Sequence, residues 1–254
     1  MSIPTNLDIA AVSYNGVDIP LAGGSSTDTL SAMLNDTLTS FTYTGTATKV
    51  FRDFMRDRRN IVSVSMNEIT EIQEYAFSGC DSMTSVSFNS ATTIGNYAFG
   101  WALSLETLHL PSATSIGSYV ITVGTPEPAN GITVVLPAAT TLSNDCFRAS
   151  RISKLDLGPG VSSFPTRCVY GTNANNHKCD VLILRKSDGI VSLANATSSI
   201  TFSNITIYVP SSLISSYQAD TNWTTVLGRT GTTMTAIEGS AYDGYYADGT
   251  AITT

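Results

Sequence analysis

The chain has 254 residues, enough for one elongated domain or two compact ones. Its formal net charge is −7 and only 13% of its residues are charged, so it should be repelled by a phosphate backbone or an anionic bilayer, which argues against nucleic-acid binding. No apolar run approaches the roughly 18 residues of a transmembrane helix, and residues 1–8 lack the basic and apolar regions of a signal peptide, so we expect neither membrane insertion nor an export leader.

Residues 1–49 show no repeat and are expected to form an N-terminal cap or an attachment segment. Asn15 and Gly16 stand between alternating residues and predict a hairpin turn. Residues 29–38 have the apolar spacing of a helix. An open end of stacked strands needs a cover, so capping and docking to a larger structure are equally supported.

The next segment repeats one apolar pattern every 22 residues. The first copy places its apolar residues at Ile72, Phe77, Met83, Val86 and Phe88, and the second at Ile94, Phe99, Leu105, Leu108 and Leu110. A fixed period of this size is typical of a solenoid. Each copy ends in apolar–polar alternation, which predicts a short strand, and its Tyr-Ala-Phe predicts a tight turn or a short helix on the opposite side.

A single coil of this kind buries too little to be stable alone. About five or six buried side chains contribute about 1.5–3 kcal/mol each, whereas ordering about 22 residues costs roughly 1–2 kcal/mol apiece in backbone entropy. We therefore predict a repeat solenoid, mainly β with short turns or helices. It should have a parallel, leucine-rich-repeat-like sheet of about six coils and be capped at both ends.

The repeat continues, less regularly, on either side of this pair. A degenerate coil begins at Val50, and its Arg56–Arg59 loop is a basic cluster that we interpret as solvated surface rather than as a site for an acidic partner. An insertion at residues 125–131 and an Asn-rich loop at residues 171–178 are either contact points or decayed repeat segments. Residues 205–209 are expected to form the last strand, followed by a helix over residues 211–220.

Ala-Phe, Leu-x-x-Val-x-Phe/Leu, Pro-x-Ala-Thr and Ile-Gly at these spacings resemble the BspA-type (Treponema-type) leucine-rich repeats of gut bacterial surface proteins and their phages. The resemblance covers roughly residues 50–238. The strand, Pro, helix and Asn222-Trp223 over residues 205–238 look like the terminal unit of such proteins. The expected organisation is an N-terminal cap or attachment segment (1–49), repeats (50–204), a capping strand and helix (205–238) and a tail (239–254) that is ordered only if something holds it.

No residue pattern points to catalysis. The chain lacks G-x-S-x-G, a P-loop, H-E-x-x-H and G-x-G-x-x-G, so we expect no enzyme, no cofactor and no metal. Its four cysteines have no C-x-x-C spacing and predict small buried thiols rather than a zinc site, with a Cys168–Cys179 bridge left open; they are Cys80, Cys146, Cys168 and Cys179.

The positive functional signal is a surface. Outward strand positions of successive coils should form one ribbon, because paired strands lie about 4.8 Å apart. This candidate binding ribbon consists of Ser85, Ser87, Thr107, His109, Thr133, Val135, Lys154, Asp156, Thr206 and Tyr208. Extended solenoid faces bind proteins or glycans, although small polar groups also serve merely to keep a sheet soluble.

Two functional classes share this mechanism. The first is a virion component of a bacteriophage, tail- or head-associated, which displays the solenoid for adhesion and docks other virion proteins through residues 1–49. The second is a bacterial cell-surface or secreted BspA-like adhesin. The absence of an export signal in the sequence favours the first, and either is compatible with a homo-oligomer. An enzyme accessory or inhibitor domain is a weaker third hypothesis.

Overall fold

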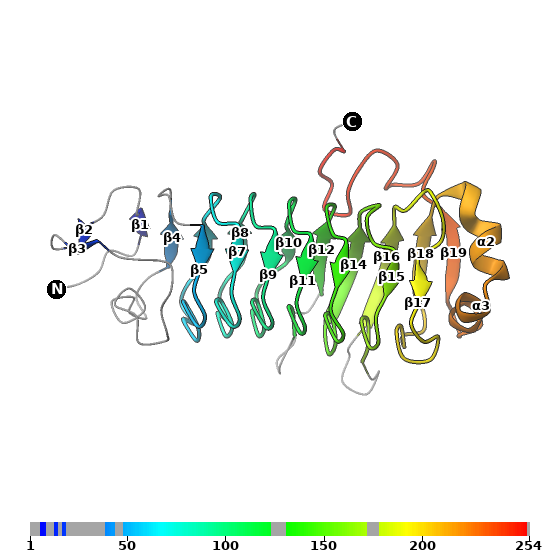
Figure 1. Cartoon of the computed structure of the whole chain (residues 1–254), viewed down its shortest axis with the longest axis horizontal. Helices are drawn as coiled ribbons and strands as arrows, with labels where there is room; N and C mark the ends of the chain where they lie inside the picture. Colours follow the sequence, from blue (N-terminus) through cyan, green and yellow to red (C-terminus); the bar gives the residue numbers. More distant parts are fainter. Residues whose placement is uncertain are drawn as a thin grey trace.

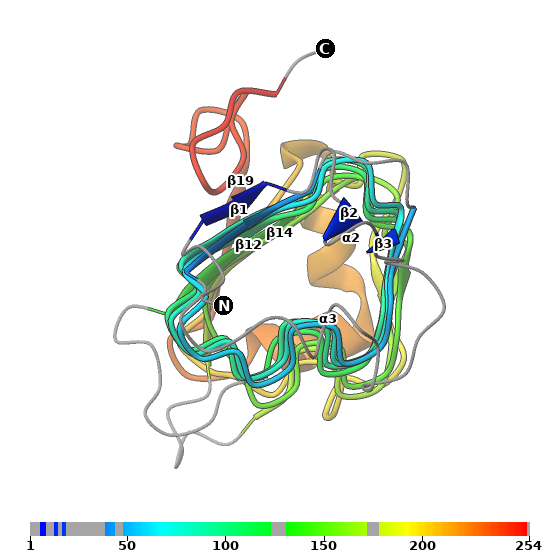
Figure 2. The same cartoon turned by 90° about the vertical axis from the view of Figure 1, so that its left-hand side faces the viewer.

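The chain folds as a parallel β-solenoid of about seven turns, which confirms the predicted repeat architecture (Figure 1). The computed structural model describes the strands at residues 6–8, 13–14 and 17–18 and residues 39–43, 48–122, 131–171 and 178–252. In the end-on view of Figure 2 the coils superpose on one outline. The expected helix at residues 29–38, residues 125–130 of the insertion and most of the loop at 171–178 lie outside the described residues.

Each regular coil contributes one strand to each of two faces, and neighbouring strands within a face run parallel. Face 1 contains β1 (Asn6–Asp8), β4 (Ser40–Thr42), β6 (Ser63–Ser65), β8 (Ser85–Ser87), β10 (Thr107–His109), β12 (Ile132–Leu136), β14 (Arg151–Leu157), β16 (Lys178–Leu184), β18 (Thr206–Val209) and β19 (Thr233–Ala236). Face 2 contains β5 (Lys49–Val50), β7 (Glu71–Ile72), β9 (Thr93–Ile94), β11 (Ser115–Ile116), β13 (Thr141–Leu142), β15 (Ser163–Phe164) and β17 (Ser192–Leu193). The degenerate coil that the sequence predicts at Val50 is confirmed, because β5 pairs with β7 in the repeat register.

The core is a column of apolar side chains between the two faces. Equivalent residues of neighbouring coils lie on top of one another, and Phe77 and Phe99 stack with ring centroids 5.7 Å apart and planes 9° apart. At the corner before four of the face 2 strands, β7, β9, β11 and β13, a threonine hydroxyl donates to the carbonyl one coil earlier, as from Thr92 to Thr70 at 3.0 Å. Both interactions need the next coil, and this is why the repeat stabilises only as a stack.

Tight turns, rather than helices, join face 2 back to face 1. In six successive coils the same turn position has a positive φ between 53° and 61°, and a non-glycine residue occupies it each time: Asp53, Tyr75, Tyr97, Tyr119, Asp145 and Arg167. This left-handed conformation is uncommon for residues with a Cβ. The turn is therefore a fixed structural requirement of the coil.

Two short helices close the C-terminal end, η2 (Ser211–Leu213) leading into α2 (Ile214–Ala219), and then α3 (Thr221–Leu227). Asp220 caps α3 by accepting hydrogen bonds from the backbone N–H groups of Asn222 and Trp223. Trp223 is fully buried and donates from Nε1 to the carbonyl of Val191 at 2.6 Å. The helices thus cover the last coils from solvent.

The sequence-based end of the strand series is wrong. Residues 205–209 were predicted as the last strand, but β19 follows the helices and pairs in parallel with β18, from Thr206↔Thr233 to Val209↔Ala236. The threonine-rich, weakly apolar sequence of β19 hides its strand character. At the other end the predicted hairpin is confirmed, since β2 (Ser13–Tyr14) and β3 (Val17–Asp18) pair antiparallel.

Candidate binding surface

The ten predicted ribbon residues lie on face 1, at outward positions of five strands. Ser85 and Ser87 belong to β8, in the four-stranded N-terminal sheet. The other eight follow the register of the six-stranded sheet in two rows, one of Thr107, Thr133, Lys154 and Thr206 and one of His109, Val135, Asp156 and Tyr208. The sequence missed the β16 members of these rows, Val181 and Ile183, because it treated the run 181–184 as one apolar strand without assigning sides.

The character of the rows changes along the solenoid. Outward positions on β6 and β8 are serines, whereas those from β12 to β18 include apolar and charged side chains. Val135 and Ile183 are both fully buried although they point away from the solenoid core, and they belong to a separate apolar cluster. Something outside the coils therefore covers this half of the ribbon.

The covering element is the C-terminal segment, residues 237–252. The chain leaves β19 and runs back over face 1, outside the outline of the coils (Figures 1 and 2). The segment has its own turn structure, with Tyr246 N–H donating to the carbonyl of Thr250 at 2.8 Å and Ile252 N–H donating to that of Gly244 at 2.9 Å. The sequence predicts a tail that is ordered only if something holds it, and the ribbon is what holds it.

Charged ribbon residues bind the main chain of this segment. Asp156, which is 1% exposed, accepts from Ala247 N–H at 2.8 Å and from two nitrogens of Arg185 at 2.7 and 2.8 Å. Arg185 also donates to the carbonyls of Tyr242 at 3.3 Å and Tyr245 at 2.7 Å. Hydrogen bonds to charged groups are stronger than neutral ones, about 1.5–3 kcal/mol each. The Asp156–Arg185 pair thus forms the polar centre of a polypeptide-binding site.

A second cation and several side-chain contacts surround this centre. Lys154 Nζ donates to the carbonyl of Ala247 at 3.2 Å. The ring of Tyr242 packs edge-on against Tyr208 with centroids 4.8 Å apart. Ala247, only 5% exposed, lies in the apolar cluster. The site therefore combines main-chain recognition with positions for specific side chains.

His109 binds the far end of the segment. Its Nδ1 lies 2.8 Å from Asp248 Oδ2, and its ring meets Tyr246 edge-on at 5.7 Å. Burial raises the pKa of Asp248, but hydrogen bonds from Thr250 and the interaction with His109 outweigh it and hold that pKa below its ordinary value. The lowered pKa favours the ionised form of Asp248, which can accept a hydrogen bond from His109.

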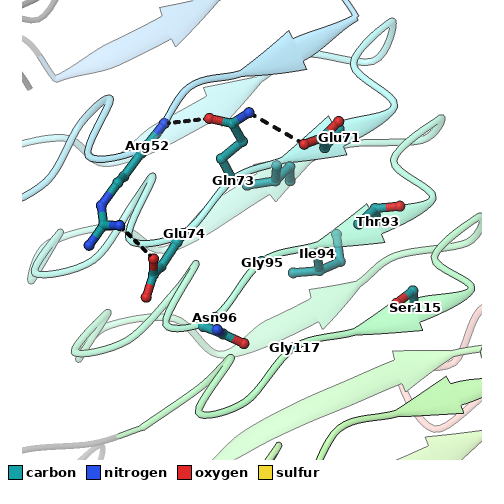
Figure 3. A pocket seen from close by; sticks show the side chains of 11 residues that line it. Arg52, Glu71, Gln73, Glu74, Thr93, Ile94, Gly95, Asn96, Ser115 and Gly117 are labelled. Atoms are coloured by element: carbon teal, nitrogen blue, oxygen red, sulfur yellow. Dashed lines mark hydrogen bonds and ion pairs between the residues drawn. The ribbon is translucent and has the colours of Figure 1, made fainter. Parts of the chain in front are cut away.

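Face 2 carries a shallow polar groove of about 390 Å³ that is lined by residues of four coils (Figure 3). Its wall is internally paired: Arg52 bonds Glu74 at 2.9 Å through its guanidinium and Gln73 Oε1 at 3.0 Å through its backbone N–H. The floor is low at Gly95 and Gly117, where an added Cβ would lie 2.7 Å from the backbone of the preceding coil. The glycines are therefore explained by coil stacking, and the groove offers few polar groups that are not already paired with one another.

Within the described part of the chain, no group of three or more His, Cys, Asp or Glu residues is arranged to hold a metal ion. No helix there is long and apolar enough to cross a bilayer. On face 1, the contacts to the turn-structured C-terminal segment are made by one buried ion pair, one lysine and one histidine.

Comparison with known proteins gives one family match. Residues 33–123 match the model of the BspA type leucine rich repeat region, in six copies. The match starts before the degenerate coil at Val50 and ends in the coil that precedes the insertion at residues 125–131. No curated protein matches the chain. The resemblance expected from the sequence is thus confirmed over the N-terminal coils.

Proposed function

This chain carries BspA-type leucine-rich repeats, a family associated with surface binding and adhesion, and on that premise we propose that it is a non-catalytic recognition protein. Its binding surface is the C-terminal half of the face 1 ribbon, from β10 to β18. Its ligand is a polypeptide segment of a protein partner, with turns like those of residues 237–252. The occupied site on face 1 is the observation that carries this proposal.

Two features of the site support a role in binding a polypeptide over the alternative that the outward side chains only keep the sheet soluble. Most of its polar contacts go to main-chain atoms of residues 242–247, so they tolerate different side chains in a ligand. Without the segment, Val135, Ile183 and the ring of Tyr208 would form an exposed apolar patch beside a charged centre. Such patches with polar rims are typical of protein interaction sites.

A glycan partner is the second candidate, and the face 2 groove is the observation that favours it. The groove is polar and open, but its lining carboxylates Glu71 and Glu74 are already paired with Lys49 and Arg52. We favour the polypeptide because the face 1 site already holds one.

The surface on which the protein works is also a proposal. A bacterial cell surface or the extracellular space accords with the repeat family. A tail- or head-associated position in a phage particle would use the same face, with residues 1–49 as a docking segment to other virion proteins. Mass spectrometry of purified particles and of surface-shaved cells separates the two settings, and particles without peptides of this chain would exclude the virion.

The binding site is tested by supplying the C-terminal segment as a separate molecule. A chain ending at Glu238 is titrated with a labelled synthetic peptide of residues 239–254, after circular dichroism has verified that its strand content is unchanged. We expect saturable binding that is lost in the Asp156→Asn and Arg185→Gln variants and kept in a Thr93→Ala control on face 2. A folded, truncated chain that does not bind the peptide would contradict the proposal.

The same variants in the full-length chain provide an independent measurement. Asp156→Asn should increase amide hydrogen exchange in residues 239–252. The neutral amide is a weaker acceptor for Ala247 N–H than the carboxylate, and it forms no ion pair with Arg185. Exchange in the face 2 strands should stay unchanged. Equal exchange in the segment with and without the substitution would show that Asp156 does not hold it.

A further inference from the structure

We propose that Cys146 and Cys168 form a disulfide that joins two successive coils when the protein folds in an oxidising environment. The two sulfur atoms lie 3.0 Å apart and both side chains are fully buried. In the structure all four cysteines are free thiols, so the bond is a modification that the fold makes available. It would close a loop of 22 residues.

The backbone of the stacked coils sets the distance between these residues. Cys146 and Cys168 hold the same position in neighbouring coils, and Phe147 N–H donates to the carbonyl of Cys168 at 2.9 Å. Neighbouring strands in such a stack lie about 4.8 Å apart, within the Cα separation of about 4.4–6.8 Å that disulfides require. Bringing the sulfurs to a bonding distance of about 2.04 Å needs a shift of about 1 Å.

Cys80 and Cys179 each have a close contact with a backbone oxygen, and Cys179 is also near enough to Cys168 to help raise the pKa of its thiol. Cys80 Sγ lies 3.2 Å from the carbonyl oxygen of Met55, and Cys179 Sγ lies 3.4 Å from that of Val181. Ala76 and Ala98 occupy the position of Cys146 and Cys168 in two earlier coils, and Phe54 and Val120 occupy it in two others. Since side chains without sulfur and of different sizes fill this position elsewhere, packing alone does not require sulfur here, and two cysteines in succession need a separate explanation.

The reaction is thiol–disulfide exchange with a small disulfide such as oxidised glutathione. The thiolate of one cysteine attacks glutathione disulfide, forms a mixed disulfide and releases one glutathione thiolate. The second cysteine thiolate then attacks the protein sulfur of that mixed disulfide and releases the second glutathione. Two electrons pass from the cysteine sulfurs to glutathione, and the two thiol protons pass through solvent to the released thiolates.

Burial determines when this exchange can occur. Loss of solvent, and then the contact with Cys146, raise the pKa of Cys168 well above its ordinary value. The folded thiols are therefore poor nucleophiles, and reagents cannot reach them. The bond should form while the coils assemble, and once formed it should be protected from reductants.

The test is refolding under two redox conditions. Reduced, denatured protein is refolded in a buffer of oxidised and reduced glutathione or in reductant alone, then denatured, alkylated and peptide-mapped without reduction. We expect a Cys146–Cys168 linked peptide in the first sample, with Cys80 and Cys179 alkylated, and a higher urea midpoint than in the reduced sample. Recovery of four alkylated cysteines, or of a Cys168–Cys179 link, would overturn the proposal.

Matched variants exclude a general effect of redox conditions. The Cys146→Ala, Cys168→Ala double variant should fold, since its alanines repeat Ala76 and Ala98, and its urea midpoint should be the same in both buffers. The Cys80→Ala, Cys179→Ala variant should still form the bond and keep the midpoint shift. If the first variant fails to fold, the second decides alone: absence of the linked peptide there contradicts the inference.

Discussion

Tyr97 and Tyr119 stack face to face, with ring centroids 4.8 Å apart and planes 2° apart, although both residues hold a left-handed backbone. Tyr75 stacks on the other side of Tyr97 at 4.8 Å, and Arg56 lies 4.6 Å above the Tyr75 ring. The left-handed conformation costs about 1–2 kcal/mol per residue. An aromatic pair contributes about 0.5–1.5 kcal/mol beyond burial, so the row of rings offsets much of the strain of the turns that carry it.

This balance predicts an unusual order of stability at position 97. Tyr97→Ala should lower the free energy of unfolding by about 1–3 kcal/mol, because the ring contacts with Tyr75, Tyr119 and Trp101 are lost while the strained backbone remains. Tyr97→Gly loses the same contacts but relieves the strain, so it should be less destabilising than Ala by about 1 kcal/mol. Urea unfolding of both variants checks this, and an alanine variant more stable than the glycine variant would contradict it.

The next coil replaces the ring with a carboxylate, and this should make stability depend on pH. Arg167, and then Arg148, hydrogen-bond Asp145 and hold its pKa below the ordinary value despite the cost of burial. A lowered folded-state pKa means that the stabilisation is present above the unfolded pKa of about 3.9 and is lost as the pH falls through the folded value.

Asp145→Asn isolates that contribution, because asparagine also tolerates a positive φ. We expect the variant to be less stable than the wild type by about 1–2 kcal/mol at pH 7. The difference should shrink towards zero as the pH falls below the unfolded pKa and through the lowered folded pKa, since the wild-type carboxyl then becomes protonated and neutral. Urea midpoints at several pH values measure it, and a difference that does not vary with pH would show that the charge of Asp145 is not responsible.

Glycine at position 158 is required by the close approach of two coils. A Cβ added to Gly158 would lie 1.7 Å from the carbonyl oxygen of Pro137, which is backbone and cannot rotate away. Gly158→Ala should therefore destabilise the protein by about 1–3 kcal/mol or more through overpacking. Gly228→Ala is the control, because its nearest contact, the Thr224 carbonyl oxygen, is at 3.3 Å. Thermal unfolding should separate the two, and equal melting temperatures would contradict the steric argument.

The regular coils could be predicted from sequence because their stabilising contacts repeat at a fixed separation. Ile72 and Ile94 pair in register, as the 22-residue period requires. The docked C-terminal segment could not be predicted in the same way. Ala247 and Asp156 are 91 residues apart, and the segment has no apolar periodicity. The sequence shows a cluster of tyrosines with an alanine and an aspartate near residue 245. Nothing in that cluster indicates which face of the solenoid it contacts.

The left-handed turns were missed for a different reason. Tyrosine is not a residue that indicates a positive φ, as glycine or asparagine would be. The repeat of Tyr75, Tyr97 and Tyr119 at one position is visible in the sequence, but its meaning depends on ring stacking between coils. A buried aromatic repeat and an exposed one are equally periodic, so periodicity alone does not separate core from surface.

The core itself gives the last prediction. Phe99 is fully buried and stacks on Phe77, while the same position of the next coil holds Ile121. Phe99→Ala should lower the free energy of unfolding by about 3–5 kcal/mol, because it removes a large buried side chain and leaves a cavity. Phe99→Leu should lower the free energy of unfolding much less, by about 1.5 kcal/mol or below. The next coil already has a branched aliphatic residue, Ile121, at the same core position.

The structural reach of that cavity can also be measured. In a solenoid each coil contacts only its neighbours, so the loss of Phe99 should weaken the coils beside it more than the distant ones. Amide hydrogen exchange should therefore rise in β8 to β11 of the Phe99→Ala variant before it rises in β16 and β18. A uniform rise along the whole solenoid would show that the coils unfold as one cooperative unit, and that stacking couples them more strongly than nearest-neighbour contacts require.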